Sequence, residues 1–223
     1  MSTRRPPYLL AVLATALVLT GYVITLAPTV TFWDAGEFIA AAKNLGIPHP
    51  PGTPLFVLIG HVWGALVPLS EYAQRTNLLS ATLSACGAGF LFLVVHETLA
   101  SYAADLPEPS ARLVRVGGSL AAALIAAFTF TNWQNSNETE VYAAATFTIS
   151  AITWLCLVWR ASRGTVRASQ VLLLILYLAG LSIGNHLLAL LVGPAVVGFL
   201  AAVLLHDPAG TPRPPPGSVR AHD

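Results

Sequence analysis

Long apolar runs separated by short polar segments dominate the chain and predict its secondary structure. A helix needs about 20 apolar residues to cross the hydrocarbon core of a bilayer. The runs predict transmembrane helices over about residues 8–28, 77–99, 116–131, 141–159, 170–184 and 187–205. The fold class expected from this pattern is all-α: a polytopic membrane bundle of about six transmembrane helices that forms a single domain, residues 1–205.

The segment between the first two runs, residues 29–76, is expected to be an outer loop that contains interfacial helices. Within it, residues 52–69 form an apolar stretch of 18 residues that a proline, two glycines and a histidine interrupt. These interruptions and the short length favour a helix that lies along the membrane surface. A further span is the alternative.

The basic residues set the expected orientation, because cytoplasmic loops carry an excess of Lys and Arg. If residues 52–69 lie on the surface, nine basic residues are cytoplasmic and only Lys43 and Arg75 are outside. If they span, the best count is eight against three, and the arginine pair before the first span is exported. We adopt the nine-to-two arrangement, although the count alone barely separates the two. It places every candidate site residue named below on the extracytoplasmic face.

Composition supports a membrane protein. The chain is 55% hydrophobic and 9% charged, with a mean hydropathy of +0.69, whereas soluble proteins average about 25% charged residues. The expected partner is therefore the lipid bilayer, and a net charge of +1 gives no support for nucleic-acid binding. The basic residues are nearly all arginine, which suggests a bacterial source and the bacterial inner (plasma) membrane. The proline-rich residues 206–223 are expected to be a disordered cytoplasmic tail.

Asp34 and Glu37 follow the first apolar run and are the candidate catalytic residues. An acidic pair at this spacing before an amphipathic segment is a variant of the capping box, which would give both side chains a structural role. A carboxylate on a loop against the membrane is also suited to act as a general base, because partial burial tunes its pKa. The two interpretations stay open and are compatible.

His49 and Arg75 are candidate substrate-binding residues in the same loop. His49 precedes Pro50-Pro51-Gly52, which favours a stiff turn, and on such a turn the imidazole could bind a phosphate. Arg75 stands just before the second long run, where arginine commonly extends to the membrane interface. Its guanidinium is also suited to grip a lipid-linked phosphate with two hydrogen bonds.

The remaining candidate substrate-binding residues lie in two further outer turns. Glu138 and Glu140 belong to a polar loop before the apolar run at 141–159, and Glu140 would also favour the dipole of the helix that starts there. Asn185 and His186 interrupt the last apolar stretch, where a tight turn is the plain interpretation. The two side chains could also line a substrate cavity.

Five motifs in this order resemble those of the protein O-mannosyltransferase-like family of polytopic membrane proteins, which belongs to the GT-C superfamily of membrane glycosyltransferases. The resemblance covers residues 28–195 and corresponds to the N-terminal half of such proteins. The motifs are Trp33-Asp34-x-Gly36-Glu37-Phe38, His49-Pro50-Pro51-Gly52-x-Pro54-Leu55, Arg75-x-Asn77-Leu78-x-Ser80, Glu140-Val141-Tyr142 and Tyr177-x-x-Gly180-Leu181-x-x-Gly184-Asn185-His186.

The resemblance implies a GT-C-like fold and the transfer of a sugar, such as mannose, from a polyprenyl-phosphate donor to an extracytoplasmic acceptor, either a protein or a glycan. It implies that Asp34 is the base, with Glu37 as its neighbour. By position, His49 and Arg75 would face the phosphate, and Glu140, Asn185 and His186 would line the acceptor or sugar pocket. The charge of the departing phosphate would be met by an arginine or by a divalent metal ion, and no other cofactor is expected.

Members of that superfamily commonly have more spans than this chain. A truncated product, a minimal enzyme and one half of a complex, with a partner subunit that supplies the missing spans, are therefore all open. A different function also competes. A transporter or flippase subunit, or a non-catalytic fragment that binds lipid-linked sugar, would use the same residues. A transporter should carry ionisable groups near the bilayer midplane, whereas these cluster at one surface.

Overall fold

The computed structural model describes residues 6–206, and within them all regular structure is helical. The elements are α1 (Tyr8–Ile24), α2 (Ala35–Asn44), α3 (Pro54–Leu66), α4 (Tyr72–Tyr102), α5 (Glu108–Phe128), α6 (Phe130–Asn137), α7 (Val141–Ala161), α8 (Val166–Ile183), the 3-10 helix η1 (Leu187–Leu191) and α9 (Val192–His206). The expected tail at 206–223 lies outside the described residues, apart from His206. The all-α fold class is confirmed.

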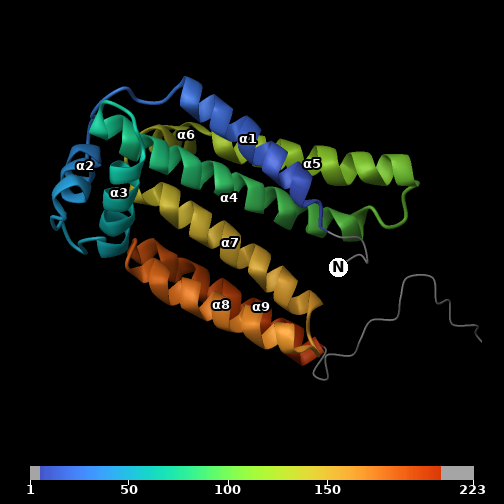
Figure 1. Ribbon diagram of the computed structural model, residues 1–223. Coiled ribbons are helices and arrows are strands. Elements are labelled where there is room, and N and C mark those ends of the chain that lie inside the picture. Colours follow the sequence, from blue (N-terminus) through green and yellow to red (C-terminus); the bar gives the residue numbers. More distant parts are fainter. Residues whose placement is uncertain (1–5, 207–223) are drawn as a thin grey trace, which may run out of the picture.

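The long helices run side by side, and the short helices gather at one end of the bundle (Figure 1). Helix α4 packs against α1, α5 and α7, and α7 packs in turn against α8 and α9. Helices α2 and α3 lie at the end where α4 begins, and α3 crosses that end instead of running alongside the long helices (Figure 1). We call this end of the bundle, with α2, α3, α6 and the turn after α8, the loop end. The position of α3 relative to a bilayer stays a prediction.

Four helices, α4, α5, α7 and α8, are long and apolar enough to cross a membrane. These helices indicate an integral membrane protein. Helices α1 and α9 are apolar but have only 17 and 15 residues. The expectation of six spans therefore rests on these two shorter helices and stays a prediction.

Small residues explain why α4 occupies the centre of the bundle. Its buried positions include Ser80, Ala81, Ser84, Ala85 and Ala88. Small side chains let helix backbones approach closely, and such packing stabilises helices that share an apolar solvent. At Gly87 the approach leaves little room for a side chain, because a Cβ there would lie 3.3 Å from the Cα of Phe147 in α7.

Charged groups are divided between the two ends of the bundle. The described arginines near the termini of α5, α7 and α8 all lie at the end opposite α2 and α3 (Figure 1); they are Arg112, Arg115, Arg160, Arg163 and Arg167. Lys43 in α2 and Arg75 in α4 are the described basic residues at the loop end. The bundle therefore has one arginine-rich end and one end with few basic residues.

The close approach at Gly87 gives a test of the packing. We expect Gly87→Val to lower the thermal midpoint in detergent by several degrees, because overpacking against backbone atoms costs about 1–3 kcal/mol. Gly180→Val in α8 is the matched control, since nothing lies within 4 Å of a Cβ at that glycine. Equal midpoints for the two variants would contradict the α4–α7 packing.

Candidate functional site

The expected site residues gather at the loop end, although they come from four separate parts of the chain. Asp34 and Glu37 lie at the start of α2, His49 in the loop between α2 and α3, Glu138 and Glu140 before α7, and Asn185 and His186 after α8. Backbone hydrogen bonds join these parts. The N–H of Leu55 donates to the carbonyl of Gly184 (2.8 Å), and the N–H of Ala27 donates to that of Asn137 (3.1 Å).

Asn77, buried at the start of α4, ties the loop before Asp34 to the bundle. Its Nδ2 donates to the carbonyl oxygens of Ala27 and Thr29 at 3.0 and 3.2 Å. Its Oδ1 accepts a hydrogen bond of 2.6 Å from the hydroxyl of buried Thr139. Three segments thus share one satisfied amide, which positions the Asp34 segment next to the start of α7.

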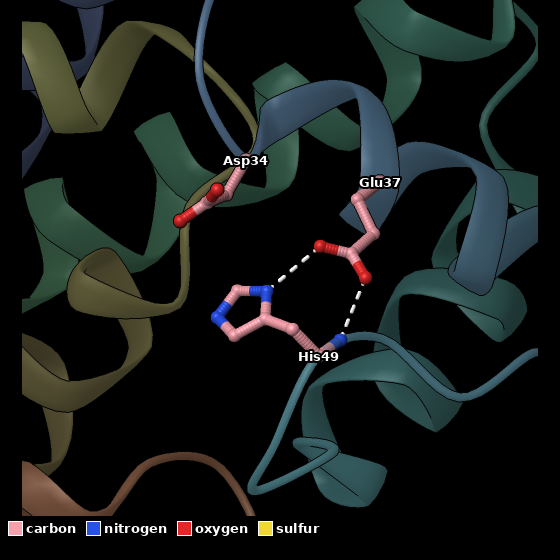
Figure 2. A group of neighbouring side chains, drawn as sticks. All are labelled: Asp34, Glu37 and His49. Atoms are coloured by element: carbon pink, nitrogen blue, oxygen red, sulfur yellow. Dashed lines mark hydrogen bonds and ion pairs between the residues drawn. The ribbon is translucent and has the colours of Figure 1, made fainter.

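Glu37 and His49 form a doubly hydrogen-bonded pair (Figure 2). One carboxylate oxygen accepts the backbone N–H of His49 at 2.6 Å, and the other lies 2.7 Å from Nδ1 of the imidazole. The hydrogen bond raises the pKa of His49 and lowers the pKa of Glu37. With Nδ1 directed at Glu37, the second ring nitrogen, Nε2, is left for a proton, a ligand or a metal ion.

The turn that holds His49 is tight. The N–H of Gly52 donates to the carbonyl of His49 at 2.9 Å, and Gly52 has φ +86°, a region that glycine adopts without steric cost. The ring of Phe38, buried in α2, lies 5.7 Å from the imidazole ring of His49. His49 therefore contributes its carbonyl oxygen to the turn and its imidazole ring to the site.

The capping interpretation of Asp34 and Glu37 is wrong in its hydrogen bonds. Asp34 occupies the N-cap position of α2, but its side chain makes no capping bond. Both carboxylate oxygens of Glu37 bind His49 instead of reaching back to the start of the helix. For Glu37 the reason is tertiary, because the loop after α2 returns and brings His49 to its carboxylate. The carboxylate of Asp34 is exposed and available for chemistry.

The side chains of Asp34, Glu37 and His49 come close enough to share an ion. Each offers one possible ligand atom, and these atoms lie within 4.8 Å of one another. In Figure 2 the imidazole ring lies below the two carboxylates and is hydrogen-bonded to that of Glu37. We call these three residues the Asp34 cluster.

Glu140 is a buried carboxyl group beside this cluster. The residue is only 6% exposed, and its backbone N–H donates to the hydroxyl of Ser80 at 3.1 Å. Burial raises the pKa of Glu140 to about 7, and the negative charges of Glu138 and Asp34 add to the shift. Glu138 is itself buried. The site thus contains a carboxyl group that is poised to change charge near neutral pH.

Asn185 and His186 lie in the turn after α8, at the loop end. Nδ2 of Asn185 donates to the carbonyl of Val141 at 3.1 Å, whereas its buried Oδ1 has no hydrogen-bond partner. Nδ1 of His186 accepts the N–H of Leu188 at 3.0 Å, and its ring lies 5.4 Å from that of Tyr142. Burial, and then the charge of His49, lower the pKa of His186.

Arg75 departs from its expected role. Its Nη1 donates to the carbonyl oxygen of Gly64 near the end of α3 (2.8 Å), and its Nε donates to that of Leu69 in the loop that follows (2.7 Å). Nη2 lies 3.5 Å from the carbonyl of Ser70. The guanidinium thus caps the C-terminus of α3, where carbonyl groups lack helical partners. This geometry favours a structural role, and the expected contact with a phosphate stays a prediction without support from these contacts.

Besides Asn77 and Thr139, the polar residues Ser80 and Thr53 at this end were given no role from the sequence. The hydroxyl of Ser80 binds the backbone of Glu140, and its place in the Arg75-x-Asn77-Leu78-x-Ser80 motif was the available signal. The hydroxyl of Thr53 is buried without a hydrogen-bond partner. No sequence pattern marks Thr53, because its burial depends on how α3 folds over the loop end.

Comparison with known proteins matches residues 34–205 to the family described as the protein O-mannosyl-transferase TMEM260 N-terminal domain. The chain belongs to this family. The match starts at Asp34 and includes every candidate site residue. The resemblance inferred from the five motifs is therefore confirmed.

Two relatives carry the same name. The mouse (Mus musculus) protein O-mannosyl-transferase TMEM260 is 30% identical over 171 residues, which are 77% of this chain and 22% of the mouse protein. The Dictyostelium discoideum protein of that name is 32% identical over 77 residues, which are 34% of this chain and 9% of that relative. The chain thus spans about a fifth of the length of the mouse relative. No solved structure matches. Both relatives are eukaryotic, and the bacterial source stays a prediction.

The hydrogen bonds of Arg75 predict a stability effect. Arg75→Gln should lower the thermal midpoint by several degrees, because the carbonyls at the end of α3 lose a charged donor. Lys43→Gln is the matched control, since it removes the same charge. The ammonium of Lys43 lies over the ring of Tyr72, 5.8 Å from its centroid. An unchanged midpoint combined with weaker binding of a lipid phosphate would instead favour the phosphate-binding role.

The raised pKa of Glu140 predicts a pH-dependent effect on stability. A carboxyl whose pKa rises from 4.5 to about 7 on folding stabilises the fold below pH 4.5, and this contribution is lost as the pH rises through 7. Glu140→Gln should therefore raise the thermal midpoint by a few degrees at pH 8 and change it little at pH 5. Exposed Glu71→Gln should show no such pH dependence. A shift of equal size at both pH values would show that ionisation of Glu140 is not the cause.

Proposed function

We propose that this chain is part of a membrane glycosyltransferase that transfers a sugar, with mannose the first candidate, from a polyprenyl-phosphate donor to an extracytoplasmic acceptor such as a protein Ser or Thr hydroxyl. The names of the relatives support the transfer of mannose to a protein. The observation that carries the proposal is the cluster of Asp34, Glu37 and His49 at one end of an apolar bundle, beside the buried carboxyl of Glu140. A lipid-linked donor reaches such a site from within the bilayer.

The proposed reaction is a single displacement with Asp34 as the general base. The carboxylate of Asp34 takes the proton of the acceptor hydroxyl while the hydroxyl oxygen attacks the anomeric carbon. The bond from that carbon to the phosphate oxygen breaks, and the lipid phosphate leaves with the electron pair. Asp34 suits this role because its side chain is exposed and makes no capping bond. Glu37 acts through His49, whose ring it orients.

The other candidate residues would line the substrate pocket. The charge of His49 acts on the pKa of both Glu140 and His186, which supports a single shared site for sugar and acceptor. The buried Oδ1 of Asn185, which lacks a partner, could accept a hydrogen bond from a sugar hydroxyl. Glu138 is buried beside Glu140 and would contribute through its charge.

The distribution of arginines supports an extracytoplasmic site. Five described arginines lie at the opposite end of the bundle, and only Lys43 and Arg75 among the described basic residues lie at the loop end. Because cytoplasmic loops are enriched in Lys and Arg, the Asp34 cluster faces away from the cytoplasm in this proposal. A transporter is the weaker candidate, since the clustered ionisable groups lie at a helix end and not at mid-bundle.

The central test is sugar transfer by Asp34→Asn. In membranes that contain the chain at matched expression, we expect the variant to transfer label from a polyprenyl-phosphate mannose donor at least 100-fold more slowly than wild type, the usual range for loss of a general base being about 10²–10⁴. Its thermal midpoint should stay close to that of wild type, because the side chain makes no capping bond. Glu71→Gln is the control for charge. Equal transfer by wild type and Asp34→Asn would contradict a catalytic Asp34, and binding of the donor without any transfer would favour a non-catalytic role.

A further inference from the structure

A half-open cavity of about 550 Å³ lies at the arginine-rich end of the bundle, opposite the Asp34 cluster. Its lining comes from the start of α1, the last third of α4, the first three turns of α5 and one residue of α7, Trp154. The start of α1, the end of α4 and the start of α5 lie away from α2 and α3 (Figure 1). Ligand cavities commonly measure about 300–1,000 Å³. The cavity is therefore large enough for a small ligand or a lipid headgroup, and its residues have no part in the proposed reaction.

Arg112 in α5 offers this cavity an unused positive charge. Its side chain is exposed, lines the cavity and makes no hydrogen bond or ion pair within residues 6–206. Arg115, one turn further along α5, differs because its Nη2 donates to the carboxylate of Glu108 at 3.0 Å. A guanidinium can grip a phosphate with two parallel hydrogen bonds. Arg112 is thus suited to hold a phosphate in the cavity.

Trp154 offers a second donor, which is uncharged. The residue is only 4% exposed and lines the cavity. Its ring contacts the ring of Tyr8 edge to face, with 6.2 Å between the centroids, but its indole N–H has no hydrogen-bond partner among the described residues. Buried polar groups are nearly always paired, so an unpaired N–H in the wall of a cavity favours a ligand that has acceptor oxygens. The phosphate and ester oxygens of a phospholipid are acceptors of this kind.

The charges that line the cavity are balanced. Arg112 and Arg115 are positive, Glu97 and Glu108 are negative, and His96 is counted as neutral at pH 7. An anionic ligand would be attracted by Arg112 but repelled by both carboxylates, whereas a zwitterion with a phosphate and an ammonium matches both signs. A carboxylate can accept several hydrogen bonds, so Glu108 can bind an ammonium while it holds Arg115.

The ammonium that fits best is a primary one. A primary ammonium donates hydrogen bonds to carboxylates, which a trimethylammonium cannot do. Trimethylammonium groups are instead recognised by cages of several aromatic rings. Among the described residues that line this cavity, Trp154 is the only Phe, Tyr or Trp. The lining therefore favours an ethanolamine headgroup over a choline headgroup.

We propose that this cavity binds the headgroup of one phosphatidylethanolamine molecule from the leaflet at the arginine-rich end. Arg112 binds the phosphate, the indole N–H of Trp154 donates to a phosphate or ester oxygen, and the carboxylates of Glu97 and Glu108 accept the ammonium. Charged side chains at helix ends lie at the level of the headgroups, and basic pockets between transmembrane helices are known to hold such groups. This inference does not depend on the proposed function, because it concerns the other end of the bundle.

Binding of defined lipids tests the site without sugar transfer. The whole chain is purified in detergent, delipidated and titrated with phosphatidylethanolamine, phosphatidylcholine or phosphatidylglycerol of identical acyl chains, and bound lipid is counted by native mass spectrometry. We expect one tightly bound phosphatidylethanolamine per chain, with an affinity about 10-fold or more above that of the other two lipids, because hydrogen bonds to charged groups are strong.

Three variants assign the contacts. Arg112→Gln should weaken binding of phosphatidylethanolamine about 10-fold or more, because the phosphate loses its charged donor. Arg167→Gln is the matched control, since Arg167 is exposed at the same end, in α8, and does not line the cavity. Glu97→Gln should reduce the preference for phosphatidylethanolamine over phosphatidylcholine. Glu97 is chosen because a change at Glu108 would also release Arg115.

The lipid preference of wild type decides the proposal even if a variant does not fold. Equal affinity for phosphatidylethanolamine and phosphatidylcholine, or tighter binding of phosphatidylglycerol, would overturn it. Equal affinity of wild type and Arg112→Gln at matched thermal midpoints would also overturn it. The expected lipid preference in a chain that transfers no sugar would support the lipid site and count against the proposed function alone. Sugar transfer without that preference would do the reverse.

Discussion

The close packing of α4 against its neighbours is the constraint on which the rest of the structure depends. In an apolar solvent, burial of apolar surface gives helices little reason to associate, so they are held together by contact and by interhelical hydrogen bonds. The buried serines, alanines and Gly87 of α4 allow this contact along its length. Because α4 touches α1, α5 and α7, its position determines how these three helices are arranged around it.

At the loop end, this packing is extended by polar contacts. Asn77, one turn into α4, binds the loop before Asp34 and the segment before α7 at the same time. Ser80, almost one turn further, holds the backbone of Glu140. A buried polar group is costly when unpaired, so satisfied contacts of this kind favour one arrangement of the loops over others. The geometry of the site therefore depends on the hydrogen bonds that Asn77 and Ser80 make near the start of α4.

The site combines exposed and buried carboxylates, and their environments separate their chemistry. Glu37 is held ionised by His49, whereas burial holds Glu140 near the midpoint of its titration at neutral pH. Such a division is typical of sites in which similar groups act differently. The opposite end of the bundle carries five of the six described arginines, so the two ends differ in charge as well as in shape. An asymmetric bundle of this kind is suited to a reaction on one side of a membrane.

The sequence by itself determined the helical fold, the membrane class, the family and the set of residues at one end, because hydrophobic runs and short motifs are local properties of the chain. It did not determine hydrogen-bond partners. Glu37 pairs with His49 instead of capping α2, and Arg75 closes α3 instead of standing free. These outcomes depend on the return of the loop after α2 and on the crossing of α3. Only the tertiary structure decided them, since a polar side chain binds whichever partner packing brings within about 3 Å.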